Sequence, residues 1–239
     1  MITVASCDLG TSGKSAICAL RGDRFRVKCI YLEAVQSIAG PDLEEMVDQV
    51  NRQFHPSIFL MEQNGPGAVF ADYLTRFKPH IPLATVDTSL PLPEGYTIPL
   101  WDEIEVNHKL VLNIRAAMYW ILRLFYRDQR STIYKEDEEL FSQLSVLRWD
   151  NDNARGDKIY MISKKKLRFT TSDLDEEPFS KSPDKADALA LAHFAYCLAE
   201  QQGMESQAGE EAEEQLIEPV SDGFFSTIGF EGEVEGDYV

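Results

Sequence analysis

Two apolar segments of this chain each end on an acidic residue. The first covers residues 3–7 and is followed by Asp8, and the second covers residues 57–61 and is followed by Glu62. Short, continuously apolar runs of this kind are typical of strands buried inside a sheet. The sequence therefore predicts a sheet in which two strands each present a carboxylate at the strand end.

The other periodic segments predict a mixed α/β sheet flanked by helices. The order of strands and helices indicates an antiparallel meander of three strands, followed by alternating strands and helices. A helix and a β-hairpin are expected as an insertion before the last helix. Further strands are predicted over residues 15–20, 24–31, 81–86 and 146–149, a hairpin over 158–169, and helices over 41–54, 66–77, 109–126, 136–144 and 182–200.

Charge is distributed unevenly along the 239 residues. The net charge is −17, but residues 201–239 contain eleven acids and no Lys or Arg, which leaves 23 − 29 = −6 for residues 1–200. The sequence predicts one globular domain over residues 1–200 and an acidic, disordered tail over residues 201–239. A body with this modest charge can still carry a local basic path for nucleic acid, whereas the tail would repel phosphate.

Cysteine spacing and hydropathy exclude several protein classes. The four cysteines lie far apart with no CxxC spacing, so they predict buried apolar side chains and neither a zinc site nor a disulfide framework. The sequence contains no apolar run long enough for a membrane span and no secretion signal, which favours an intracellular protein that does not bind membranes.

A third acid, Asp187, begins the last predicted helix, just before the apolar run 188–192. Asp8, Glu62 and Asp187 would repel one another if folding brought them together, and the motifs that contain them offer no neutralising arginine. A divalent cation such as Mg²⁺ or Mn²⁺ would resolve this repulsion, and two ions can hydrolyse a phosphodiester. The alternative is that such acids cap helices or lie in solvent, and Asp184 at the helix start suits the helix dipole.

Three motifs resemble the nuclease domain of phage large terminase subunits. Residues 182–192, with the sequence SPDKADALALA, resemble the terminal motif of that domain, and residues 112–120 are similar to its Asn-x-Arg-Ala helix motif. Residues 62–67 are similar to its acid followed by a glycine-containing turn, and Ser163-Lys164 lies between the motifs in the expected order. The resemblance covers about residues 1–200.

This resemblance implies a ribonuclease H-like fold with a five-stranded mixed sheet. It implies an endonuclease that uses two Mg²⁺ or Mn²⁺ ions and cuts concatemeric double-stranded viral DNA during genome packaging in the host cell cytoplasm. Implied metal ligands and catalytic residues are Asp8, Glu62 and Asp187, with Asp184 as a candidate fourth ligand. Many relatives carry a further acid where this chain has Lys14.

The resemblance also implies macromolecular partners. They are double-stranded DNA, the ATPase motor domain of the terminase, the small terminase subunit and the portal protein. Because the sequence contains no motor motifs, we expect either an excised nuclease domain or a nuclease encoded apart from its motor. Basic side chains on the predicted helix and hairpin are candidates for phosphate contact, although such residues are more often solvated: Arg115, Lys164, Lys165, Lys166 and Arg168.

Four other interpretations compete with this one. Residues 8–15 resemble a Walker A loop in which Asp8 stands where the first glycine is required, and the match is short. The same segment resembles the first phosphate motif of sugar kinases and actin-like ATPases, but the chain lacks their second domain. A Holliday-junction resolvase would share the fold and the acid–Gln pair at residues 62–63, without the insertion over 101–170. A DNA-binding or capsid-docking module with vestigial acids is the non-enzymatic alternative.

Overall fold

The computed structural model describes residues 1–10, 14–23, 25–35, 40–133, 136–150, 158–162 and 184–213. Its strands are β1 Ile2–Leu9, β2 Ser15–Gly22, β3 Val27–Val35, β4 Ile58–Glu62, β5 Leu83–Val86, β6 Thr97–Pro99, β7 Glu105–Asn107, β8 Ser131–Ile133, β9 Trp149–Asp150 and β10 Tyr160–Met161. Its helices are α1 Pro41–Phe54, α2 Pro66–Phe77, α3 Ile114–Arg127, α4 Glu138–Ser145 and α6 Asp184–Glu213.

The central sheet has six strands in the order β5-β4-β1-β2-β3-β8. Strands β1, β2 and β3 form the predicted antiparallel meander, whereas β4 is parallel to β1 and β5 is parallel to β4. The prediction of five strands is wrong by one, because β8 pairs in parallel with the outer edge of β3. Only three residues long, β8 is too short to give a recognisable hydrophobic period.

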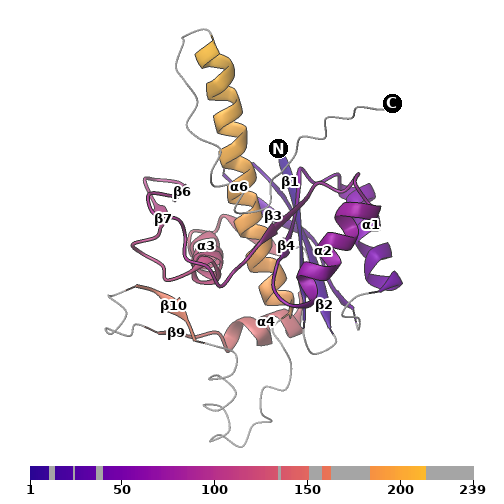
Figure 1. The fold of residues 1–239 in the computed structure, drawn as a ribbon. Coiled ribbons are helices and arrows are strands. Elements are labelled where there is room, and N and C mark those ends of the chain that lie inside the picture. The colour runs from indigo at the N-terminus through magenta and orange to yellow at the C-terminus, as the bar shows by residue number, and fades with distance from the viewer. Residues whose placement is uncertain are drawn as a thin grey trace, which may run out of the picture.

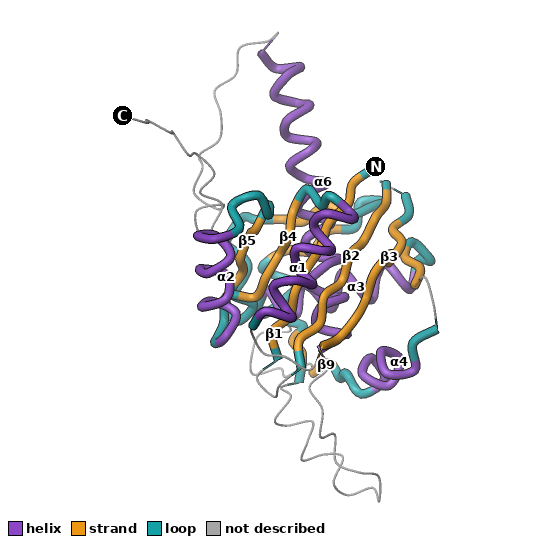
Figure 2. The backbone as a smooth tube through the Cα atoms, turned by 90° about the vertical axis from the view of Figure 1, so that its right-hand side faces the viewer, coloured by secondary structure: helices purple, strands orange, loops and turns teal. Residues whose placement is uncertain are grey.

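Helices cover both faces of the sheet (Figures 1 and 2). On one face α1 and α2 bury an apolar cluster that includes Ala5, Phe59 and Leu74. On the other face α6 and α3 bury a larger cluster that includes Val4, Leu60 and Phe194. Alternate residues of β1 and β4 therefore point into different cores, as expected for strands buried on both faces.

Helix boundaries depend on local capping. Helix α1 matches the predicted range, since Pro41 lies in its first turn and His55, with φ of 47°, ends it in the left-handed region. Helix α3 begins later than the predicted residue 109, because the side chain of Asn113 caps it by accepting a 2.9 Å hydrogen bond from the N–H of Ala116. Helix α6 continues to Glu213, beyond the predicted end near residue 200.

The predicted hairpin differs in its strands. Strand β9 pairs antiparallel with β10, so the hairpin joins residues that the sequence had assigned to two separate elements. A second antiparallel pair, β6 and β7, lies before α3 and was not predicted. All four cysteines are buried and none forms a disulfide, which confirms the predicted burial of their side chains. No helix among the described residues is both long and apolar enough to cross a membrane.

Candidate active site

Asp8 and Glu62 lie side by side at one end of the sheet. The parallel register pairs Ser6 with Leu60 and Cys7 with Met61, so Asp8 and Glu62 occupy the next position on the two neighbouring strands. Because side chains alternate along a strand, both point to the same face as Ser6 and Leu60, which is the face covered by α6. The sheet thus brings together two acids that are far apart in the sequence.

The first turn of α6 adds two more acids to this end of the sheet. The hydroxyl of Ser6 donates a 2.7 Å hydrogen bond to the backbone oxygen of Ala188, which holds this turn against β1. A Cβ atom built on Gly10 would lie 2.8 Å from Oδ1 of Asp184, so Asp184 packs closely on the end of β1. Asp8, Asp184 and Asp187 are each at most 4% exposed.

An arginine lies among these acids, contrary to the expectation from the motifs. Nη2 of Arg115 donates to Oδ1 of Asp187 at 2.8 Å, and the hydroxyl of Tyr119 donates to the same oxygen at 2.6 Å. The Arg115 and Tyr119 side chains are one turn apart on α3 and therefore project from the same side of that helix. The side chains of Arg115 and Asp187 are 24% and 6% exposed, so this ion pair is largely shielded from water.

The charges around Arg115 show which acids it neutralises. Burial alone would lower the pKa of the guanidinium, but the charges of Asp187, Glu62 and Asp8 act in the opposite direction and raise it overall. Burial and the charge of Asp187 raise the pKa of the Tyr119 hydroxyl, which keeps it protonated as a donor. Arg115 is therefore the counter-cation of the acid cluster. Its predicted contact with DNA stays a prediction.

Glu62 is half-buried and is oriented by two neighbours. Its Oε1 accepts a short hydrogen bond from the Thr88 hydroxyl and a 3.2 Å bond from Nδ2 of Asn64. The backbone oxygen of Thr88 also accepts from the N–H of Arg115 at 2.9 Å, which links Glu62 to the start of α3. Sequence reasoning missed Thr88 and Tyr119. The helical spacing of Tyr119 from Arg115 was the available signal for the tyrosine.

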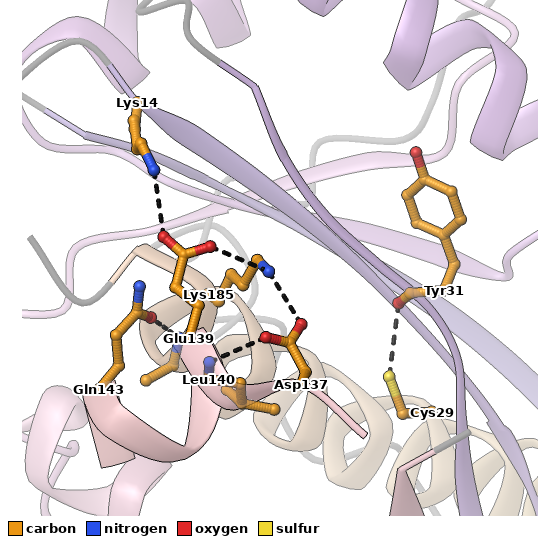
Figure 3. Close-up of polar contacts among 9 residues, drawn as sticks. Lys14, Cys29, Tyr31, Asp137, Glu139, Leu140, Gln143 and Lys185 are labelled. Atoms are coloured by element: carbon orange, nitrogen blue, oxygen red, sulfur yellow. Dashed lines mark hydrogen bonds and ion pairs between the residues drawn. The ribbon is translucent and has the colours of Figure 1, made fainter. Parts of the chain in front are cut away.

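The start of α6 is also bound to the start of α4 (Figure 3). Nζ of Lys185 lies 2.8 Å from Oδ2 of Asp137 and 3.1 Å from Oε2 of Glu139, and Nζ of Lys14 lies 3.1 Å from the other oxygen of Glu139. The N–H of Ala186 donates to the Gln143 side chain at 3.0 Å. These contacts hold the first turn of α6 against the start of α4, and they pair Lys14 with Glu139 of α4.

The kind of ligand at this site favours a divalent ion, but the spacing of the described ligands does not form a closed ion site. Three or four carboxylates are the oxygen ligands that Mg²⁺ and Mn²⁺ prefer. Within the described ranges, however, no three His, Cys, Asp or Glu side chains lie close enough together to hold one ion. In this arrangement Arg115 contacts Asp187, and Asp8, Glu62, Asp187 and Asp184 are the residues that would hold an ion if their carboxylates moved closer together. The predicted phosphate contacts Lys164, Lys165, Lys166 and Arg168 lie outside the described residues.

Comparisons with solved structures identify the fold. The nuclease domain of the large terminase subunit gp2 of bacterial virus Sf6 matches with a TM-score of 0.60 and 14% identity, over 81% of this chain and 88% of that one. A mutant of that domain, with manganese and beta-thujaplicinol, matches with a TM-score of 0.59 and 16% identity over the same shares. The large terminase nuclease from thermophilic phage G20c with bound magnesium matches at 0.51 and 14%, over 81% of this chain and 80% of that one.

These likenesses confirm the expected fold. The chain has the ribonuclease H-like α/β fold of phage large terminase nuclease domains, with a central mixed sheet and helices on both faces. No protein-family model and no curated protein matches the sequence. At these low identities the structural likeness establishes the fold, and the chemistry has to be argued from the residues of this chain.

Proposed function

We propose that this chain is a divalent-metal-dependent endonuclease that cuts double-stranded, concatemeric viral DNA during genome packaging. The observation that supports the proposal most directly is the convergence of Asp8, Glu62 and Asp187 on the α6 face of the sheet. Two of these acids lie at the ends of buried strands and the third lies in the first turn of a buried helix, so burying their charges is costly unless the charges serve a purpose.

The three acids are the proposed metal ligands, with Asp184 as the candidate fourth. The ions would be Mg²⁺ or Mn²⁺, and structural neighbours were solved with manganese, calcium or magnesium. The basic residues Arg115, Lys164, Lys165, Lys166 and Arg168 are the proposed DNA contacts. The proposed partners are the terminase motor domain, the small terminase subunit and the portal protein, in the host cytoplasm.

Plasmid digestion tests this function. We expect the wild-type chain to cut supercoiled plasmid with Mg²⁺ or Mn²⁺ and not with a chelator. Asp8→Asn, Glu62→Gln and Asp187→Asn each keep side-chain size and should lower the cleavage rate by at least about 100-fold. Asp72→Asn is the matched control, because Asp72 is an acid on α2 whose side chain is 61% exposed.

Two results would contradict the proposal. Undiminished cutting by all three variants would refute the site assignment, and DNA binding without any metal-dependent cutting would favour a non-catalytic docking module. A four-way DNA junction serves as a second substrate. Cleavage of the junction far faster than of linear duplex would favour a resolvase over a packaging nuclease.

A further inference from the structure

One oxygen of Asp187, which is one of the two acids that α6 contributes to the site, already accepts hydrogen bonds from protein donors. Oδ1 of Asp187 accepts hydrogen bonds from both Arg115 at 2.8 Å and Tyr119 at 2.6 Å. Bonds from a charged donor to a carboxylate are short and strong, and those seen here are shielded from water. An ion that uses this oxygen as a ligand must compete with both donors.

Arg115 also supplies positive charge where the acid cluster needs it. It interacts electrostatically with Asp187, Glu62 and Asp8, which come from α6, β4 and β1. Without a cation, these three carboxylates would repel one another in a partly dehydrated site. The guanidinium relieves this repulsion. A divalent ion placed among the same oxygens would lie close to the guanidinium and would be repelled by it.

The α3 backbone limits how far Arg115 can withdraw as a whole. The N–H of Arg115 is bonded to the oxygen of Thr88, and the N-cap Asn113 binds the N–H of Ala116. The first turn of α3 is thus anchored at two points, so release of Asp187 has to come from rotation of the Arg115 side chain. With 24% of its surface exposed, this side chain has a path to solvent.

We propose that Arg115 is a positioning residue whose ion pair with Oδ1 of Asp187 holds a metal-free arrangement and competes with a divalent ion for that oxygen. This inference rests on the proposed function for the identity of the ion. It explains why the acids converge and yet no three of the described acids are close enough to share an ion. Arg115 thereby stabilises the metal-free protein and lowers its affinity for metal.

Calorimetric titration of the full chain with Mn²⁺ tests the competition. Arg115→Gln removes the charge, and we expect the variant to bind Mn²⁺ about tenfold more tightly, which corresponds to about 1.4 kcal/mol. Its melting temperature in chelator should fall, and saturation with Mn²⁺ should raise it more than in the wild type. Arg123→Gln is the matched control, since Arg123 lies on the same helix over the Trp120 ring and is not paired with Asp187.

A second measurement uses the wild-type protein, in case Arg115→Gln does not fold. The guanidinium NMR signals of Arg115 are assigned as those missing from Arg115→Lys. We expect these signals to change as Mg²⁺ is added and to lose the slow rotation that is typical of an ion-paired guanidinium. The signals of Arg123 should not change.

Several outcomes would overturn the inference. They are equal or weaker Mn²⁺ binding by folded Arg115→Gln and Arg115 signals that do not change at saturating Mg²⁺. These two results are separable from a failure of the proposed function, whereas binding of no ion by either protein would overturn both. Loss of the function appears as an absence of metal-dependent DNA cleavage by the wild type, whatever the variant binds.

Discussion

The hydroxyl of Ser6 donates a 2.7 Å hydrogen bond to the backbone oxygen of Ala188, although 182 residues separate the two along the chain. Both groups are buried. This bond joins the middle of β1 to the first turn of α6, two residues before Asp8 and one residue after Asp187. It therefore links the two elements that bring these acids together.

Replacement of Ser6 by Ala should weaken this link without changing the core volume much. We expect the free energy of unfolding to fall by about 1 kcal/mol, because one buried hydrogen bond is lost. Cleavage should fall more than this change in stability would explain, since Asp187 loses its alignment with Asp8. Urea unfolding and plasmid digestion measure the two effects. Ser57→Ala is the control, because Ser57 donates to Thr3 at an exposed position. Unchanged cleavage would show that the bond does not position the site.

Gly10 tests the close contact between β1 and α6. An added Cβ would overlap the backbone oxygen of Lys14 and lie 2.8 Å from Oδ1 of Asp184. We expect Gly10→Ala to displace Asp184 and to destabilise the protein by about 1–3 kcal/mol, as overpacked sites do. Thermal unfolding measures the loss. In Gly203→Ala the added Cβ meets nothing within 4 Å, so that variant should be at least as stable as the wild type.

Lys185 and Lys14 contact the same Glu139 but differ in burial. The side chain of Lys185 is 12% exposed and also bonds Asp137, whose side chain is 7% exposed. We expect Lys185→Met to cost about 3 kcal/mol, because a largely buried carboxylate loses a paired charge. Lys14→Met should cost less than about 1 kcal/mol, because its ion pair with Glu139 is more exposed, at 28% and 37%. Chemical denaturation of both variants gives the comparison, and equal losses would contradict this account.

The buried His193 should make the free energy of unfolding depend on pH. It is fully buried, its Nδ1 lies 2.8 Å from the oxygen of Leu189, and its Nε2 lies 2.9 Å from the Ser131 hydroxyl. Because a carbonyl oxygen only accepts, Nδ1 carries the proton of the neutral ring and Ser131 donates to Nε2. Burial lowers the pKa of His193 from its ordinary value of 6.5 to about 4.

The unfolded chain therefore binds a proton at His193 in a pH range where the folded chain does not. The stabilisation is fully present above pH 6.5 and is lost as the pH falls towards 4, at about 1.4 kcal/mol per pH unit. Urea unfolding at several pH values gives the slope of the free energy of unfolding against pH. This slope should be smaller for His193→Gln than for the wild type. An unchanged slope in His193→Gln would refute the buried neutral state.

Helices and strands were predicted well where the residues that define their ends lie within the element or next to it. The bounds of α1 and the end of β4 at Glu62 follow from a helix-starting proline, a chain-reversing His55 and an apolar run. Short strands such as β8 and β6 were missed, because three residues carry no measurable period. The continuation of α6 past residue 200 was missed because its last part is polar and has no apolar face.

The sequence was enough to predict which acids belong to the candidate site, but not how the side chains of the site contact one another. Asp8, Glu62 and Asp187 could be selected because an acid next to a long apolar run is costly to bury. The contact of Arg115 with Asp187 could not be predicted, since a basic residue on an amphipathic helix is usually solvated. Only the packing of α3 against α6 shows that its guanidinium contacts Asp187.

The sequence by itself determined most of the segments that become strands and helices, and that two strands end with an acid and the last helix begins with one. These properties depend on neighbours along the chain, such as side-chain alternation, helical spacing and capping groups. The tertiary structure alone decided that β1, β4 and α6 bring their acids together and that Arg115 and Tyr119 of α3 occupy Asp187. These contacts depend on sheet order and helix packing, which join residues that no local pattern relates.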